Sequence, residues 1–290
     1  MTSQKIVVLL AISAVLAEPA AAEEPVVLAG PALGTTYRVT LGGPIHGLDR
    51  GEVHRELERV LATIDRAAST WREDSDASRF NAAGVEAWVP VADELATIVE
   101  IARGVSAASR GAFDITGTTG MQFLELRREA GRASLRKRRA GVRLDLGGIG
   151  PGYAVDRLGA RLCELSSRAH LVELGGEVRG WGARSDGQPW RVRIVHAGVS
   201  SGTATDIPLA DGEAVATSSR RPGGSHVDPR TGRAVSTGPL AVTVRAGSCA
   251  EADAWAVAAI VLGLEPGDGI LAITDIQRQL ALNHRSAAPE

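Results

Sequence analysis

Residues that could bind a ligand or take part in catalysis gather in glycine-rich stretches of this sequence. Five stretches contain more Gly, Asp and Thr than packing requires, and they are residues 34–36, 111–116, 145–152, 174–177 and 228–232. Glycine at the end of a strand lets a ligand approach the backbone, because no Cβ intervenes. We therefore take these stretches as the first candidates for a binding site.

One of these stretches leads from a predicted strand into a predicted helix at residues 147–152. Such a junction presents free N–H groups and the positive end of the helix dipole, both of which attract phosphate. Residues 148–152 lack the G-x-G-x-x-G spacing of dinucleotide-binding proteins, and the sequence contains no Walker A motif. By itself the stretch is compatible with weak anion binding or with a tight strand-to-helix turn.

Two further residues could act on protons or metals. His226 precedes a turn at residues 228–232. An imidazole has an unperturbed pKa of about 6.5 and can transfer protons near neutral pH, although an isolated His in a loop is often a surface residue. Asp253 lies among Ala, Trp and Val in a predicted helix. It either complements the helix dipole from the first turn or serves as a metal ligand that faces a cleft.

The elements that would position these residues are mixed along the chain. Apolar residues recur at helical spacing in four segments, which are 51–69, 93–109, 152–165 and 250–262. Strands are expected at 36–41, 142–146, 170–174, 190–195, 214–217 and 240–245. Gly263 suits the C-cap of the last helix. Because strands and helices do not alternate strictly, we expect one large α+β domain, which could form two lobes around a cleft.

The first 22 residues have the parts of a secretory signal peptide. Lys5 precedes an apolar run at 6–17, and the small residues 20–22 form an A-x-A cleavage site. The run is shorter than the roughly 20 residues that span a bilayer, and a buried N-terminal helix is the alternative. No Cys stands near the cut, so a lipid anchor is not expected. We predict that residues 23–290 form a soluble, exported domain, in the periplasm where the cell has one.

Charge and cysteine content exclude several classes of protein. A net charge of −2 gives no field that would attract nucleic acid or an anionic membrane. The basic cluster at 127–143 is expected to be a solvated hairpin rather than a binding patch. Cys163 and Cys249 could pair in an oxidising compartment, but both fall in helical patterns where a free Cys packs as a small hydrophobe. Two cysteines without clustered His give no zinc or haem signature.

Taken together and in order, these stretches resemble the FAD:protein FMN transferase family, also called ApbE-type proteins. The resemblance covers about residues 30–263. It rests on a series of motifs at 34–37, 69–81, 111–114, 144–154, 174–177, 225–232 and 252–255. Members of this family bind FAD in a cleft and use Mg²⁺. They move the FMN half of FAD onto a Thr or Ser hydroxyl of an acceptor protein and release AMP, while some relatives hydrolyse FAD to FMN and AMP.

The resemblance implies roles for particular residues. His226 is the candidate proton acceptor, and Asp253 is implied both in catalysis and as a ligand of Mg²⁺. The other metal positions are the backbone carbonyl of Gly148 and the residue four places after Asp253, which is Val257. Flavin contacts are implied at Leu33, Trp71, Ala112, Phe113, Asp114, Asp145, Pro151 and Val227. The indole of Trp71 could stack on a flat ring.

The sequence departs from the family pattern mainly at the metal site. Val257 replaces the usual Thr, so Mg²⁺ loses an oxygen ligand there. Ala256 lacks the acid of some relatives, and Pro151 replaces a Lys or Glu. The spacing from His226 to Asp228 is one residue short, and Leu33 stands where Met is common. Three hypotheses follow: an active Mg²⁺-dependent transferase or FAD hydrolase, a flavin-binding protein with little turnover, and a structural or interaction protein that has lost the flavin.

Overall fold

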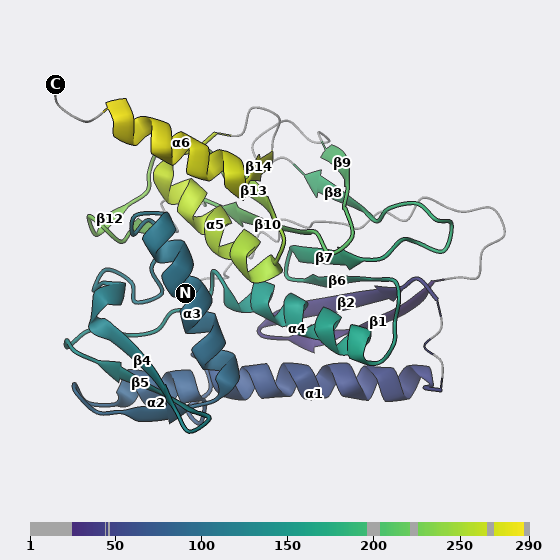
Figure 1. Cartoon of the computed structure of the whole chain (residues 1–290), viewed down its shortest axis with the longest axis horizontal. Helices are drawn as coiled ribbons and strands as arrows, with labels where there is room; N and C mark the ends of the chain where they lie inside the picture. Colours follow the sequence, from purple (N-terminus) through teal and green to yellow (C-terminus); the bar gives the residue numbers. More distant parts are fainter. Residues whose placement is uncertain are drawn as a thin grey trace, which may run out of the picture.

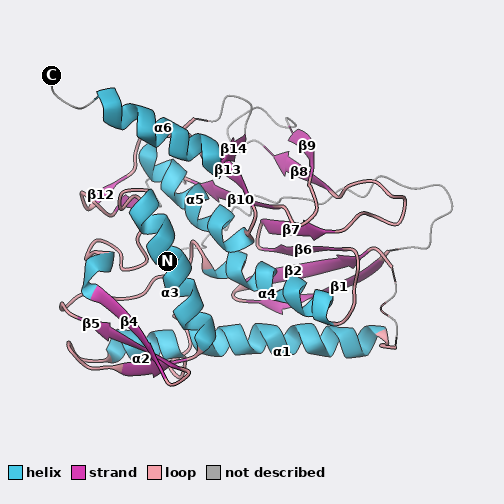
Figure 2. Cartoon of the chain, viewed as in Figure 1, coloured by secondary structure: helices cyan, strands magenta, loops and turns pink. Residues whose placement is uncertain are grey.

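The central element of the chain is a seven-stranded sheet (Figures 1 and 2). The structure, a computed structural model, describes residues 25–43, 45, 47–195, 204–220, 226–265 and 270–286. The strand order is β1 (Val26–Ala32), β2 (Thr35–Leu41), β6 (His170–Leu174), β7 (Glu177–Trp181), β10 (Ala214–Ser219), β13 (Ala241–Ala246) and β14 (Ile270–Ala272). Neighbours are antiparallel except β13 and β14, which are parallel. The predicted signal peptide at 1–22 lies outside the described residues.

Two layers of helices cover one face of this sheet. The helices α4 (Gly150–Glu164) and α5 (Cys249–Leu262) pack directly on the strands. Next to them lie α1 (Arg50–Ala68) and α3 (Asp93–Ala108), and α6 (Ile273–Ser286) packs beside α5 (Figure 1). The main hydrophobic core fills the space between these helices and the sheet. It therefore holds α4 and α5, whose ends carry the candidate site.

The opposite face of the sheet is covered by a hairpin of β8 (Arg191–Val195) and β9 (Ala204–Pro208). The expected alternation is confirmed, because Val192 and Ile194 are buried while Arg191 and Val195 are exposed. Together with residues from β6, β7 and β10 they form a second, smaller core.

A three-stranded sheet of β3 (Val89–Val91), β5 (Arg132–Lys137) and β4 (Leu124–Glu129) lies beside α2 (Asp76–Ala82) and α3 (Figure 1). A short 3-10 helix, Met121–Phe123, precedes β4, and β11 (Val227–Asp228) pairs with β12 (Arg233–Ala234). The first part of the basic cluster forms the β4–β5 hairpin as expected, and residues 138–143 follow β5 without regular structure. Its arginines pair with acids, as Arg128 does with Asp93 and Glu100.

The four predicted helices are confirmed to within two residues at their ends. Local signals explain this agreement for α1, because Asp49 and Glu52 form a capping box at its start. Gly263 ends α5 in the left-handed conformation with a φ of 66°, as its position predicts. Five of the six predicted strands are also present, as β2, β6, β8, β10 and β13.

The predicted strand at 142–146 is wrong. Val142, Leu144 and Leu146 alternate into the core, but no strand of the described residues pairs with this segment. The side chain of Asn81 takes the place of a partner strand, accepting from the N–H of Leu144 at 2.6 Å and donating to its carbonyl at 3.1 Å. Alternation reports burial on one side and not strand pairing.

The two cysteines do not pair in this structure. Cys249 is buried, as expected of a small hydrophobe, but Cys163 is exposed, so that part of the prediction is wrong. Within the described ranges, no helix is long and apolar enough to cross a membrane.

We expect the buried His170 to make folding sensitive to acid. It is fully buried, its ring stacks on Trp181, and burial lowers its pKa from 6.5 to about 4. The unfolded chain binds this proton at a higher pH than the folded chain, so the stabilisation is complete above pH 6.5 and is lost as the pH falls towards 4. The loss is roughly 3 kcal/mol.

Urea unfolding of the original chain and of His170→Gln between pH 7.5 and 4.5 measures this loss. The substitution is expected to flatten the decline of the unfolding free energy with falling pH, whereas His54→Gln, at a partly exposed position of α1, is the control that leaves it unchanged. Equal slopes for all three proteins would contradict the prediction.

Candidate functional site

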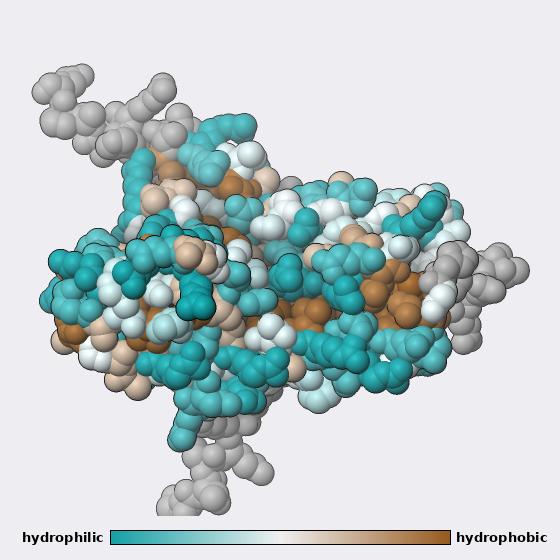
Figure 3. Space-filling view, turned by 60° about the horizontal axis from the view of Figure 1, so that its bottom comes forward, coloured by the Kyte–Doolittle hydropathy of each residue, from teal (hydrophilic) through white to brown (hydrophobic). Residues whose placement is uncertain are grey.

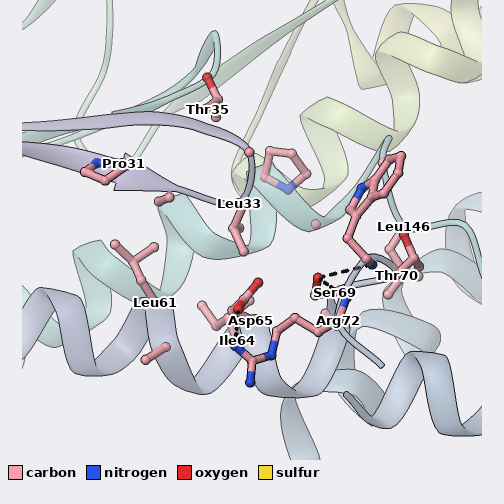
Figure 4. Close-up of a pocket in the computed structure, with 18 of the residues that line it drawn as sticks. Pro31, Leu33, Thr35, Leu61, Ile64, Asp65, Ser69, Thr70, Arg72 and Leu146 are labelled. Carbon is pink, nitrogen blue, oxygen red and sulfur yellow. Dashed lines mark hydrogen bonds and ion pairs between the residues drawn. The ribbon is translucent and has the colours of Figure 1, made fainter. Parts of the chain in front are cut away.

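The candidate site is a cavity of about 920 Å³ beside the start of α4 (Figure 4). Its walls come from the β1–β2 turn, the side of α1 with the loop 69–72 that follows it, and the turn before α4. On the face of the molecule that carries α1, apolar surface forms a band between hydrophilic residues (Figure 3). Of the eight positions implied for flavin contacts, three line this cavity, and they are Leu33, Trp71 and Pro151.

Leu33 occupies a strained position in the cavity wall. It forms a two-residue hairpin turn with Gly34, and both have positive φ angles, of 49° and 79°. This turn type favours Asn and Gly, and a Leu there carries backbone strain. Such strain persists where the surroundings enforce it, often at ligand-binding positions.

Trp71 presents its indole to solvent from a well-held loop. Its side chain is 95% exposed. The hydroxyl of Ser69 accepts from the N–H groups of Trp71 and Arg72, and the Arg72 guanidinium binds Asp65 and Asp74. An exposed aromatic ring on a held loop can stack on a planar ligand.

The start of α4 offers fewer N–H groups than the sequence suggested. Pro151 has none, the N–H of Gly152 donates to Asp253 at 3.2 Å, and that of Gly147 donates to Asp145 at 3.0 Å. The positive end of the helix dipole remains. Anion binding at this turn therefore depends on the dipole and on any bound cation more than on hydrogen bonds from α4.

The loop with Ala112, Phe113 and Asp114 lies behind the turn rather than in the cavity wall. Ala112 and Phe113 are buried, and the Phe113 ring comes within 3.6 Å of the place that a Cβ on Gly148 would take. Asp114 accepts from Thr116 and Met121 within its own loop, and burial raises its pKa. These contacts hold the loop against Gly148.

The structure brings the three implied metal positions together. Asp253 and Val257 lie one turn apart on α5, and the Cγ2 of Val257 is 2.8 Å from the place of a Cβ on Gly148. The helices α4 and α5 approach closely because residue 152 is glycine: a Cβ there would lie 2.4 Å from the carbonyl oxygen of Cys249. This close approach lets the Gly152 N–H reach the Asp253 carboxylate.

Negative charge accumulates around Asp253. Its side chain is 6% exposed, and burial together with the Asp156 carboxylate raises its pKa to about 7. Burial and the charge of Asp253 raise the pKa of Glu177 well above its usual value. Asp156 itself binds Arg179 at 2.7 Å and accepts from the N–H groups of Cys249 and Ala250 at the start of α5. The site therefore has a surplus of carboxylate that a cation would compensate.

Sequence reasoning did not select Asp156 and Glu177. Asp156 lies on an amphipathic helix, where a charged residue is read as solvent-facing, and Glu177 was noted only as part of a glycine-rich motif. A signal for Glu177 is its place directly after two glycines at the start of a central strand.

The donor atoms fit Mg²⁺ as a site with few protein ligands. The carboxylate of Asp253 and the carbonyl of Gly148 are hard oxygen donors, whereas Val257 supplies methyl groups only. No group of three or more His, Cys, Asp or Glu residues that could hold a metal occurs in the parts of the chain that are described. Mg²⁺ commonly keeps several waters and binds substrate phosphates, so two protein ligands are compatible with it.

His226 lies on the segment between β10 and β11. Its Nε2 is 3.0 Å from the Ser218 hydroxyl, and burial and the nearby Arg220 lower its pKa, so the ring is neutral at pH 7. Val227, next to it, is 48% exposed. The β11–β12 hairpin packs on the loop of Phe113, since the Cγ of Arg230 is 3.6 Å from the place of a Cβ on Gly111.

Gly152→Ala is expected to destabilise the fold by roughly 2 kcal/mol or more, because its Cβ would overlap backbone atoms of α5. The same change should displace Asp253 from the start of α4. Thermal unfolding and Mg²⁺-dependent turnover are the measurements. Gly104→Ala is the matched control: it lies in the exposed interior of α3 with nothing within 4 Å, and should stabilise the chain slightly. A Gly152→Ala protein as stable as the original would contradict the close approach.

The fold and the cavity define a single-domain α+β protein with its site at the start of α4. A model of the ApbE family matches residues 33–122 and 116–279, and the chain therefore belongs to the ApbE family. It is 31% identical over 288 residues to the FAD:protein FMN transferase of Klebsiella pneumoniae, covering 84% of this chain and 81% of that protein.

Solved structures of flavin transferases share the fold. The flavin transferase ApbE from Vibrio cholerae superimposes with a TM-score of 0.76 at 30% identity, covering 83% of this chain and 88% of that chain. The flavinyl transferase ApbE of Pseudomonas stutzeri, in its apo form, gives a TM-score of 0.73 at 31% identity, covering 85% and 86%. The single α+β fold predicted from the sequence is confirmed.

Proposed function

We propose that this chain is a FAD:protein FMN transferase. It binds FAD, moves the FMN moiety onto a Thr or Ser hydroxyl of an acceptor protein, and releases AMP with the help of Mg²⁺. The observation that carries this proposal is that the buried Asp253 carboxylate accepts from the Gly152 N–H at the start of α4, next to the cavity, while Val257, one turn further along α5, lies against Gly148. Family membership and the names of the relatives support it.

The cavity walls suit two parts of FAD, the flavin ring system and the pyrophosphate. The exposed indole of Trp71 and the side chain of Leu33 offer a flat, apolar surface for a ring system. The start of α4 forms another part of the wall, and the positive end of its dipole favours the pyrophosphate. Ala112, Phe113, Asp114, Asp145 and Val227 stay proposed contacts around this cavity.

The remaining residues have proposed roles in the transfer step. Asp253 and Gly148 would hold Mg²⁺, which when bound neutralises pyrophosphate charge. His226 is neutral at pH 7 because burial lowers its pKa, so it can take the proton of the attacking hydroxyl. Asp156 and Arg179 keep the start of α5, and with it Asp253, in place.

We also propose that residues 1–22 direct export and that the domain works outside the cytoplasm. There it would meet exported acceptor proteins.

The test is to incubate the purified chain with FAD, with and without Mg²⁺, in the presence of an acceptor peptide. Two peptides are compared, one with a single Thr and one with Ala in place of that Thr. The proposal expects Mg²⁺-dependent AMP release and flavin on the Thr peptide only. Free FMN with AMP and no labelled peptide would instead show a FAD hydrolase. Bound FAD without AMP would show a flavin-binding protein. If no flavin binds, the transferase, the hydrolase and the flavin-binding protein are all rejected.

A further inference from the structure

A serine, a histidine and an arginine meet at the end of β10, outside the metal positions. Ser218 is half-buried, and its hydroxyl lies 3.0 Å from the Nε2 of His226. By strand alternation its side chain shares a face with Ala214 and Ala216, which are buried in the layer that packs against α5. A hydroxyl in hydrogen-bond contact with a neutral imidazole is the arrangement of an activated nucleophile.

Arg220 supplies positive charge to this pair. Its two terminal nitrogens donate to the carbonyls of Ser236 and Gly238, at 2.9 and 3.1 Å. Within the described residues these partners are backbone carbonyls and not carboxylates, and the buried Nε of Arg220 has no hydrogen-bond partner. The guanidinium lies close enough to His226 to lower the imidazole pKa. A cation held by carbonyls and lacking a counter-charge attracts a phosphate.

This group lies on elements that pack against those of the proposed transfer site. The helix α5, which carries Asp253 and Val257, packs on β10, the strand of Ser218. From His226 the chain runs directly into the β11–β12 hairpin, which contacts Gly111, and the adjacent Phe113 borders Gly148. Nucleophile, proton acceptor and phosphate ligand are thus connected through packed elements to the metal positions.

We propose that Ser218 is an internal acceptor of FMN, so that the chain attaches FMN to itself when FAD is bound and no acceptor protein is present. This inference rests on the proposed transferase function and adds a second, self-directed activity to it.

The step balances as a phosphoryl transfer. The Ser218 Oγ attacks the phosphorus on the FMN side of the pyrophosphate while its proton passes to the Nε2 of His226. A phosphoester bond forms between Ser218 and FMN. The bond from that phosphorus to the bridging oxygen breaks, and AMP leaves with the electron pair. Arg220 binds the phosphate oxygens that carry the developing charge.

If Ser218 only orients His226, it gains no flavin. The full chain is therefore incubated with FAD and Mg²⁺ without acceptor, denatured, and examined by intact mass, in-gel flavin fluorescence and peptide mass spectrometry. We expect one FMN on the peptide that contains Ser218. Ser218→Ala should lose it and Ser218→Thr should retain it. Ser219→Ala, on the opposite face of β10, is the matched control and should behave like the original chain.

The outcomes separate this inference from the proposed function. An acceptor peptide that becomes labelled while the chain carries no FMN, or carries it on another residue, overturns the inference and leaves the transferase standing. An FMN on Ser218 without a labelled peptide supports the inference and counts against the acceptor-protein reaction. If Ser218→Ala fails to fold, the mapped site in the original chain and in Ser218→Thr decides.

Discussion

Asp253→Asn is expected to lower Mg²⁺-dependent AMP release roughly 100-fold or more, because an amide cannot supply the charge that holds the cation. Asn keeps the shape of Asp and can still accept from the Gly152 N–H. We therefore expect the Asp253→Asn protein to lose activity while it keeps its fold. Steady-state turnover with FAD across a range of Mg²⁺ concentrations, beside thermal unfolding, is the measurement.

The same substitution should stabilise the metal-free protein above neutral pH. The pKa of Asp253 is raised from 3.8 to about 7, so the unfolded chain releases this proton at a lower pH than the folded chain. Stability from this group is highest in acid and declines as the pH rises from about 4 to 7. Asn removes that decline, a gain of up to on the order of 4 kcal/mol at pH 8.

Urea unfolding at pH 5 and pH 8 in the presence of a chelator measures this gain. The control is Glu251→Gln, an exposed change on the same helix that keeps the Ser248 cap and should alter neither activity nor pH dependence. An Asp253→Asn protein that keeps turnover would show that this carboxylate is not the cation ligand, and one that is less stable than the original at pH 8 would contradict the raised pKa of Asp253.

Val257→Thr is expected to tighten Mg²⁺ binding by about tenfold, which is about 1.4 kcal/mol. Val and Thr have the same branched shape, so the contact with Gly148 is kept while one methyl becomes an oxygen. Turnover should rise most at low Mg²⁺ concentration. The measurement is the Mg²⁺ concentration that gives half-maximal AMP release, together with the Mg²⁺-induced shift in Tm.

Val261→Thr, one turn further along α5, is the matched control. It adds the same hydroxyl away from Gly148 and should cost stability without changing Mg²⁺ dependence. If Val257→Thr leaves the Mg²⁺ dependence unchanged, the cation binds elsewhere.

The sequence by itself determined the elements that depend on local chemistry. The helices α1, α3, α4 and α5 follow from apolar spacing, and their ends follow from caps such as Asp49 and Gly263, which need only a few neighbouring residues. The order of the motifs also determined the family, since the resemblance and the family model agree. The turn at Gly148 is recognisable from its glycine-rich pattern alone.

Only the tertiary structure decided how the site is charged and connected. Asp156, Glu177 and Asp253 lie far apart in sequence, and their raised pKa values arise because α4, β7 and α5 bury them together. The hydrogen bond of Ser218 to His226 likewise depends on where the chain returns after β10. Burial and contacts between distant elements set the pKa values and this hydrogen bond. Sequence periodicity predicts neither of them, because it indicates which face of an element is covered and not which residues cover it.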